Sequence, residues 1–181
     1  MKAISTVLSC LFLVSFINAQ EQFLTKKGMI SFFSETPIEN IKAENNQVLS
    51  IVDVSNGQMA IAILMKSFMF DKALMQEHFN ENYVASDKYP KATFKGTILD
   101  FDKITVSETI KAINGNLTMH GITKEITIEA SIKKTSNAIK MTGDFFINLA
   151  DFGVEIPAIV KNNISEKIKI SFRFQHTPYK K

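Results

Sequence analysis

The chain has 181 residues, of which 45% are hydrophobic and 22% charged; this excludes a disordered protein and is enough for the core of one domain. The formal net charge is +3, and lysine supplies 20 of the 21 basic residues, with Arg173 the single arginine. Because arginine best recognises phosphates and bases, and these lysines are spread along the chain, the composition argues against a nucleic-acid partner.

The first residues have the pattern of a secretory signal peptide. Lys2 provides the positive start, residues 7–17 form an apolar run, and a small residue, Ala19, precedes a cleavage site at Gln20. We expect residues 1–19 to be removed and residues 20–181 to form a single domain that is periplasmic or secreted. No later stretch approaches the roughly 18 apolar residues of a transmembrane helix, so we expect no such segment in the mature protein.

Cys10 is the only cysteine of the chain. Residues 7–10 loosely resemble a lipoprotein cleavage box, which leaves lipidation of Cys10 as an alternative to ordinary secretion. Cleavage before Cys10 would, however, leave almost no apolar run, so we expect ordinary secretion. The mature chain would then contain no thiol and no disulfide.

Eight segments alternate between apolar and polar residues with a period of two. The alternation is weaker in the first five and strong in the last three, and the segments are residues 27–34, 47–53, 58–68, 92–99, 109–119, 126–133, 141–149 and 167–174. This pattern is typical of an antiparallel sheet with one wet face. Eight such strands form a sandwich or a barrel, and short turns at 55–57, 120–121 and 136–137 favour an up-and-down barrel without exposed edges.

A long connection separates the third segment from the fourth. Within it, Asp71 has the position of a helix N-cap, and Phe70 and Met75 have the spacing of a hydrophobic staple. Leu74, His78 and Phe79 continue an apolar stripe, so we expect a short helix around 71–80 with one face on the protein. Structured connections of this length are often lids.

The sequence predicts no catalytic residue, no metal site and no cofactor. His78, His120 and His176 have no partner at the spacing of metal ligands, and no serine lies in a G-x-S-x-G elbow. We expect His78 to be a partly buried residue of the helix and His120 to be a turn residue bonded to the backbone. The protein is therefore not expected to be an enzyme.

Three blocks of the chain resemble the YceI-like proteins: KSFMFDKALMQEHFNENYVASDKYPKATFKG (66–96), NGNLTMHGITKEITIEA (114–130) and FFINLADFGVEIP (145–157). The resemblance covers essentially the whole mature chain. It implies an exported, lipocalin-like barrel of eight antiparallel strands. It also implies a ligand, because some relatives hold a polyisoprenoid or similar amphiphilic lipid inside the barrel.

Two functions follow as hypotheses. The preferred one is a lipid-binding protein that holds an isoprenoid or other long apolar chain; the alternative is a structural or interaction protein of the envelope whose barrel is filled by side chains. The sequence leaves the oligomeric state open. The alternation predicts which side chains point into the barrel, and the lipid that the resemblance implies would make them its binding lumen: Ile61, Ile63, Met65, Phe94, Ile98, Leu117, Met119, Ile128, Phe145, Ile147, Ile170 and Phe172. The predicted lid residues are Phe70, Leu74, Met75, Phe79 and Tyr83, and the predicted outer-face residues are Lys66, Lys95, Thr118, Glu129, Lys169 and Arg173.

Overall fold

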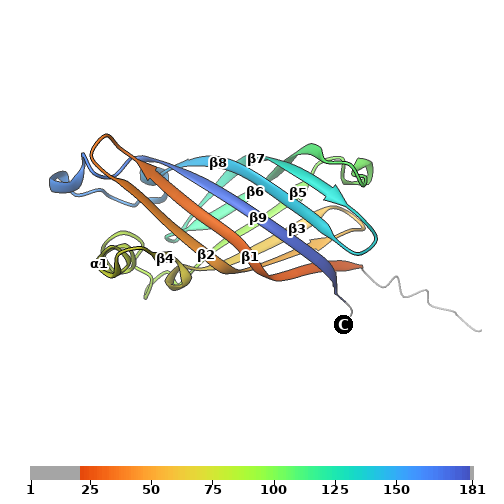
Figure 1. Ribbon diagram of the computed structural model, residues 1–181, viewed down its shortest axis with the longest axis horizontal. Coiled ribbons are helices and arrows are strands. Elements are labelled where there is room, and N and C mark those ends of the chain that lie inside the picture. Colours follow the sequence, from red (N-terminus) through yellow and green to blue (C-terminus); the bar gives the residue numbers. More distant parts are fainter. Residues whose placement is uncertain (1–20, 180–181) are drawn as a thin grey trace, which may run out of the picture.

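Eight long antiparallel strands close into a barrel in the computed structural model, which describes residues 21–179 (Figure 1). The strands are β1 (Gln22–Glu35), β2 (Asn40–Asp53), β3 (Gln58–Leu64), β5 (Lys91–Ile98), β6 (Thr109–Met119), β7 (Ile122–Lys134), β8 (Ile139–Asn148) and β9 (Lys167–Tyr179). Each pairs with the long strands before and after it in the chain, and β1 also pairs with β9. The expected up-and-down barrel is confirmed. The expected signal peptide, with Cys10, lies outside the described residues.

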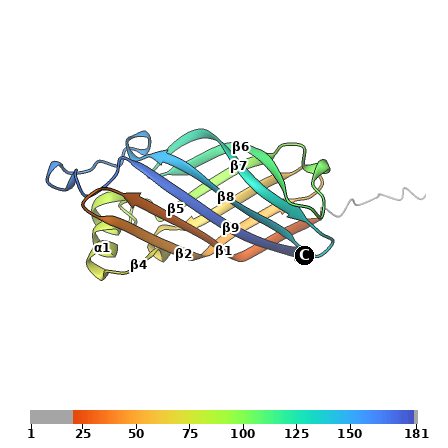
Figure 2. The same ribbon diagram turned by 45° about the horizontal axis from the view of Figure 1, so that its top comes forward.

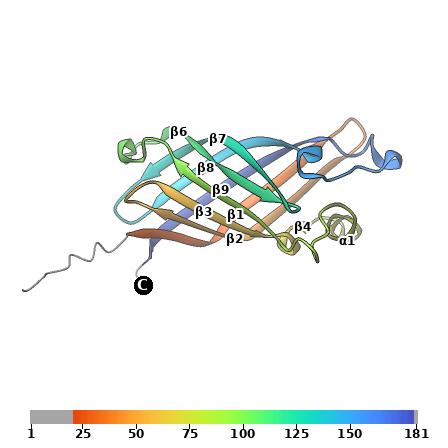
Figure 3. The ribbon, with the colours of Figure 1, turned by 180° about the vertical axis from the view of Figure 1, so that it is seen from behind.

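The connections gather at two ends of the barrel (Figures 2 and 3). We call one the mouth end; it carries the β1–β2 turn, the connection 65–90, the β6–β7 turn and the connection 149–166. The other, the closed end, carries the β2–β3 and β7–β8 turns and the connection 99–108, which contains η3 (Phe101–Lys103). In Figure 1 the mouth end lies at the left, beside α1, and β9 ends at the right.

The strands form where the sequence alternates, because every second side chain then enters the core. In β5, Ala92, Phe94 and Ile98 are buried, whereas Lys91 and Lys95 are exposed. Of the outward residues expected from the sequence, Lys66, Lys95, Glu129 and Arg173 are exposed, and Thr118 and Lys169 are partly exposed. The inward and outward faces read from the sequence are therefore found in β5, β6, β7 and β9.

Strands β1 and β2 are 14 residues each, longer than the expected segments 27–34 and 47–53. Their pairing shifts register between Thr25 and Gly28 and again between Gly28 and Ile30. A bulge of this kind inserts a residue and breaks the period of two, which hides the strand in the sequence. Gly28 fits here because a Cβ would come within 2.5 Å of the Phe174 ring.

Two of the ladders are much shorter than their strands. β2 pairs with β3 only over Leu49–Val52 and Met59–Ala62, and β7 pairs with β8 only over Ser131–Lys134 and Ile139–Thr142. Both paired stretches lie toward the closed end, so these neighbouring strands separate toward the mouth. The two-residue strand β4 (Met69–Phe70) pairs with β2 where β3 has left it.

The connection 65–90 contains the expected helix, with two corrections. It runs from η1 (Met65–Ser67) through β4 and α1 (Ala73–His78) into a π-helical turn, η2 (Phe79–Tyr83). The N-cap is Lys72 and not Asp71, because the helix begins one residue later than expected and has no side-chain cap. Leu74 is 61% exposed, so its assignment to the inward face is wrong. The inward face is instead formed by Met75 and Phe79, four residues apart on one side of the turn.

The β6–β7 turn explains the pair His120-Gly121. Both residues have positive φ angles, +51° and +79°, and Met119 pairs directly with Ile122. A two-residue hairpin with two positive φ angles is a type I′ turn, for which glycine in the second position is favoured. The His120 Nδ1 atom lies 3.0 Å from the Phe152 carbonyl oxygen in η4 (Leu149–Phe152), so this turn residue is bonded to the backbone as expected.

Candidate ligand cavity

Two adjoining cavities follow the inside of the barrel from the mouth end. The outer one, which we call the mouth cavity, has a volume of about 280 Å³, and the inner cavity one of about 80 Å³. Five residues line both of them: Met65, Phe68, Met119, Ile147 and Ile170. Because the same side chains border both spaces, the two cavities are neighbours along one apolar channel, and the inner space is the smaller. The larger part of the channel is close to the lower size limit of typical small-molecule sites.

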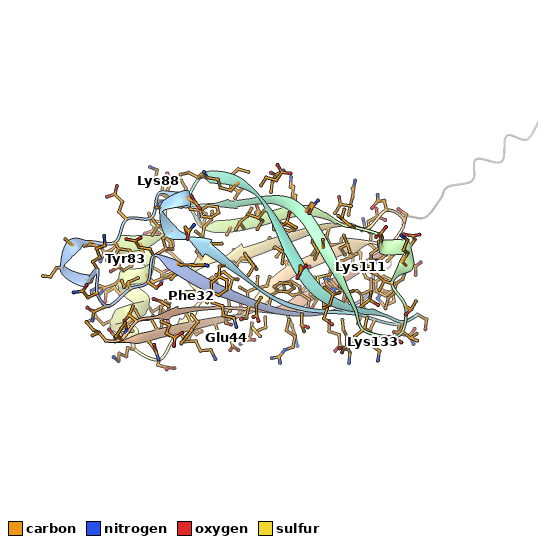
Figure 4. All side chains as sticks on the ribbon, turned by 90° about the horizontal axis from the view of Figure 1, so that it is seen from above. Phe32, Glu44, Tyr83, Lys88, Lys111 and Lys133 are labelled. Atoms are coloured by element: carbon orange, nitrogen blue, oxygen red, sulfur yellow. The ribbon has the colours of Figure 1, made fainter. Side chains whose placement is uncertain are left out.

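Four phenylalanine rings form one wall of the mouth cavity. Phe32 comes from β1, Phe68 and Phe70 from the segment around β4, and Phe79 from η2. Five pairs of these rings have centroids 5.1–5.6 Å apart, in stacked, tilted and T-shaped arrangements. The cluster attaches the connection 65–90 to the barrel wall. Figure 4 shows Phe32 and Tyr83 toward the same end of the molecule.

The aromatic ring of Phe94 lies over two glycines and shapes the inner cavity. Gly96 of β5 and Gly115 of β6 are directly paired, and a Cβ on either would come within 2.7 Å of the Phe94 ring. The missing side chains therefore leave room for Phe94 to lie flat against the wall. Deeper still, Phe172 and Phe174 stack with centroids 5.4 Å apart, and the fully buried Ile132, Ile139 and His176 fill the closed end.

A small set of polar groups borders the mouth cavity. Glu39, which precedes β2, lies 3.2 Å from Lys72 Nζ through Oε1 and 3.5 Å from Asn163 Nδ2 through Oε2. The Ser34 hydroxyl accepts a hydrogen bond from the Ser165 backbone N–H. Partial burial raises the pKa of Tyr83, so its hydroxyl stays protonated and can donate a hydrogen bond.

Comparison with known proteins adds the decisive observation. The sequence family model described as the YceI-like domain matches residues 21–176, nearly all of the described chain. The chain belongs to the YceI-like family. Among proteins with curated descriptions, none matches it.

Solved structures share the fold of this YceI-like chain at low sequence identity. A polyisoprenoid binding domain from Saccharophagus degradans, implicated in plant cell wall breakdown, has a TM-score of 0.77 at 14% identity, over 87% of this chain and 98% of that one. Burkholderia cenocepacia BcnA has a TM-score of 0.70 at 16% identity, over 83% and 96% of the two chains. A Campylobacter jejuni YCEI protein has a TM-score of 0.56 at 15% identity, over 99% and 94%.

The YceI-like barrel brings the expected lumen residues together. Eleven of the twelve line the inner cavity; the exception is Ile98, which is buried nearer the closed end, where its N–H bonds the Gly57 carbonyl. Four expected lid residues, Phe70, Met75, Phe79 and Tyr83, line the mouth cavity. Leu74 does not, since the α1 face that carries it is turned to solvent. That these residues bind lipid stays a prediction.

Part of the site was missed by sequence reasoning. The connection 149–166, which contains η5 (Ala158–Val160), closes the side of the mouth opposite the phenylalanine wall; its contributing residues are Leu149, Val154, Val160, Asn163 and Ile164. Leu149 belongs to the alternating segment 141–149, but the rest of the connection has no helical or strand period, so no pattern pointed to it. His78 lines the mouth as well, but it is exposed and not partly buried as expected.

Residues 21–179 contain no group of three or more His, Cys, Asp or Glu side chains placed to hold a metal ion. In the same range, no helix is both long and apolar enough to cross a membrane. A serine–histidine pair does occur, with Ser50 Oγ 2.8 Å from His176 Nε2. Both residues are completely buried at the closed end, and the other ring nitrogen faces the Ile139 carbonyl instead of a carboxylate. The pair is therefore part of the packing and lacks the third group and the access of a hydrolase site.

Proposed function

We propose that this YceI-like barrel is an exported, non-catalytic carrier that holds an isoprenoid or another long apolar chain in its lumen. The observation that carries the proposal is that the mouth and inner cavities are adjacent and share five apolar lining residues. A polyisoprenoid binding domain with the same fold supports the choice of ligand. The signal pattern of residues 1–19 supports export.

Apolar burial can supply the affinity. Each buried methylene contributes roughly 0.8 kcal/mol, so a tail of about ten carbons gains roughly 8 kcal/mol. Association costs roughly 4–15 kcal/mol in lost translational and rotational freedom, so short tails are not retained. Because the inner cavity is the smaller of the two, we expect the tail to occupy the inner cavity and the polar head to remain at the mouth.

The alternative, a filled barrel without ligand, is favoured by the packing of the closed end. Phe174, Ile132, Met141 and His176 have between 0% and 1% exposure, and of these Phe174 and Met141 border the inner cavity whereas Ile132 and His176 do not. This packing limits how deep a tail can reach, but the mouth half of the barrel remains open for one. The two functions therefore differ in whether the open half carries a ligand.

The test is extraction of the protein purified after export, with organic solvent and mass spectrometry, followed by reloading of the stripped protein with a polyisoprenol. We expect close to one lipid per chain and saturable reloading. A stripped protein that takes up no polyisoprenol would favour the alternative function. Intact-mass analysis tests export: a chain beginning at Gln20 supports it, and a diacylglyceryl-modified chain beginning at Cys10 contradicts ordinary secretion.

A further inference from the structure

One formally charged side chain, Glu39, is present among the described residues that line the mouth cavity, with histidine counted as neutral. Its position is fixed by the β1–β2 turn, where the Thr36 hydroxyl accepts the Glu39 N–H at 3.0 Å and donates to the Glu39 carbonyl at 2.9 Å. The side chain retains 28% of its exposure. A carboxylate is thus held at the point where a ligand's polar head would emerge from the apolar channel.

The five lysines within the connections 65–90 and 149–166 and at the start of β9 are already engaged. Lys66 pairs with Asp87 at 2.6 Å, Lys72 with Glu39 at 3.2 Å and Lys161 with Glu166 at 3.3 Å. The two other lysines of the mouth connections lie over aromatic rings, Lys88 over Tyr89 and Lys167 over Phe146. None of these amines points into the cavity lining.

Carboxylates at the mouth outnumber these lysines. Residues 35–40, 66–90 and 148–167 together contain nine Asp or Glu and five Lys. Glu77 and Glu81 line a groove on the outer side of α1, with Asp87 beside them. The opposite end has basic residues such as Lys111 and Lys133, which Figure 4 shows far from Tyr83. The potential at the mouth is therefore negative.

We propose that the mouth selects amphiphiles whose headgroup carries no negative charge, and that Glu39 is the residue that sets this selection. This inference rests on the proposed lipid-binding function. A phosphate or carboxylate at the mouth would meet the Glu39 carboxylate, and the one cation paired with it, Lys72, lies outside the cavity lining. A hydroxyl, amide or ammonium can instead donate a hydrogen bond to the Glu39 carboxylate.

Lys72 is the group that could oppose this selection. Its side chain is 68% exposed, and exposed ion pairs of this kind contribute little to stability. A donor headgroup can therefore replace the Lys72 amine on Glu39 at small cost. Lys72 partly neutralises the carboxylate, so its removal should sharpen discrimination against anions, and removal of Glu39 should weaken it. These opposite effects distinguish a charge-based mouth from a purely steric one.

The experiment compares two ligands with one tail, farnesol and farnesyl monophosphate, by displacement of a fluorescent apolar probe from the stripped protein at pH 7 and low salt. We expect farnesol to bind at least tenfold more tightly than the phosphate. One charge at a partly exposed site corresponds to about a fivefold change in affinity. Glu39→Gln should therefore reduce the ratio of the two affinities, farnesol over farnesyl monophosphate, by about that factor. Lys72→Gln should widen it, and 0.5 M salt should narrow it through screening.

Glu35→Gln is the matched control, because the substitution removes the same charge from the same turn region. Unlike Glu39, Glu35 does not line the mouth cavity. Glu35→Gln should change the ratio less than twofold. Equal binding of the two ligands, or a ratio unaffected by Glu39→Gln, overturns this inference while lipid binding stands. If neither ligand displaces the probe, the proposed function fails and this inference fails with it.

Discussion

Acidification should destabilise the barrel through His176, a residue of the closed end. The ring is completely buried between Ser50 and the Ile139 carbonyl, with the Phe174 ring 5.8 Å away. A carbonyl oxygen only accepts hydrogen bonds, so Nδ1 carries the proton and Nε2 accepts from the Ser50 hydroxyl. Burial lowers the pKa of His176 from 6.5 to about 4, although the bond to Ile139 acts in the opposite direction.

The sign and size of the effect follow from this difference. The unfolded chain binds a proton at His176 near pH 6.5, whereas the folded chain does so only near pH 4. Stability is therefore fully present above pH 6.5, falls as the pH drops through this window, and stops changing on this account below about 4. Each pH unit is worth about 1.4 kcal/mol, so the loss is about 3 kcal/mol. Such a loss is a large part of the stability of a typical domain.

The assay is urea unfolding followed by far-ultraviolet circular dichroism at several pH values between 7.5 and 4.5. His176→Gln should be less stable than the parent at pH 7.5 but nearly independent of pH within the window. His78→Gln, an exposed matched control, should keep the parental slope. If His176→Gln retains that slope, the buried ring is not its source.

The two carboxyl groups with a lowered pKa, Asp100 and Asp144, should not disturb this measurement. A hydrogen bond from Ser171 lowers the pKa of the Asp144 carboxyl, and a hydrogen bond from Lys103 lowers that of Asp100. Groups with a lowered carboxyl pKa lose their contribution at pH values below the ordinary 3.8. Their titration therefore lies on the acidic side of the window used for His176.

Three further substitutions, two of them with a matched control substitution, test the lumen and its wall. Phe94→Asp should abolish lipid retention and lower the free energy of unfolding in urea by at least about 4 kcal/mol, because the carboxylate would be buried without a partner. Lys95→Asp, on the outer face, should do neither. If the two variants behave alike, the assignment of Phe94 to the inner face and Lys95 to the outer face is wrong. Gly115→Ala should cost about 2 kcal/mol or more, because the new Cβ would meet the Lys95 carbonyl oxygen, and an unchanged midpoint refutes the close strand contact. Phe79→Ala should lower lipid retention several-fold in the extraction assay, while Leu74→Ala, on the solvent side of α1, should leave it unchanged.

The sequence predicted most of the barrel because the alternation within each strand shows which of its side chains enter the common core. Phe94, Ile128 and Phe172 could be placed in the lumen from their spacing alone, since a period of two fixes which face is buried. The starts of β1 and β2 could not be found, because the bulge near Gly28 breaks this period.

The mouth was less predictable for physical reasons. A helix of six residues is too short for the apolar spacing to fix which of its faces lies on the protein. Leu74 and Met75 are both apolar, so the spacing did not decide which of them faces inward. Beyond Leu149, the connection 149–166 has no period at all. Burial of His176 depends on its contact with Ser50, a residue 126 positions away, which no local pattern contains.

The short β2–β3 and β7–β8 ladders leave the barrel wall with fewer hydrogen bonds between strands toward the mouth than toward the closed end. Toward the mouth, residues 122–130 of β7 pair with β6, and residues 143–148 of β8 pair with β9, but the β7–β8 ladder has already ended. The circumference can therefore widen at this end without the loss of any β7–β8 ladder bond, and the same holds between β2 and β3 beyond Leu49 and Ala62. Strand pairing is therefore continuous around the closed end and interrupted at two places toward the mouth. A ligand wider than the resting channel can be accommodated by bending strands, without unfolding any of them.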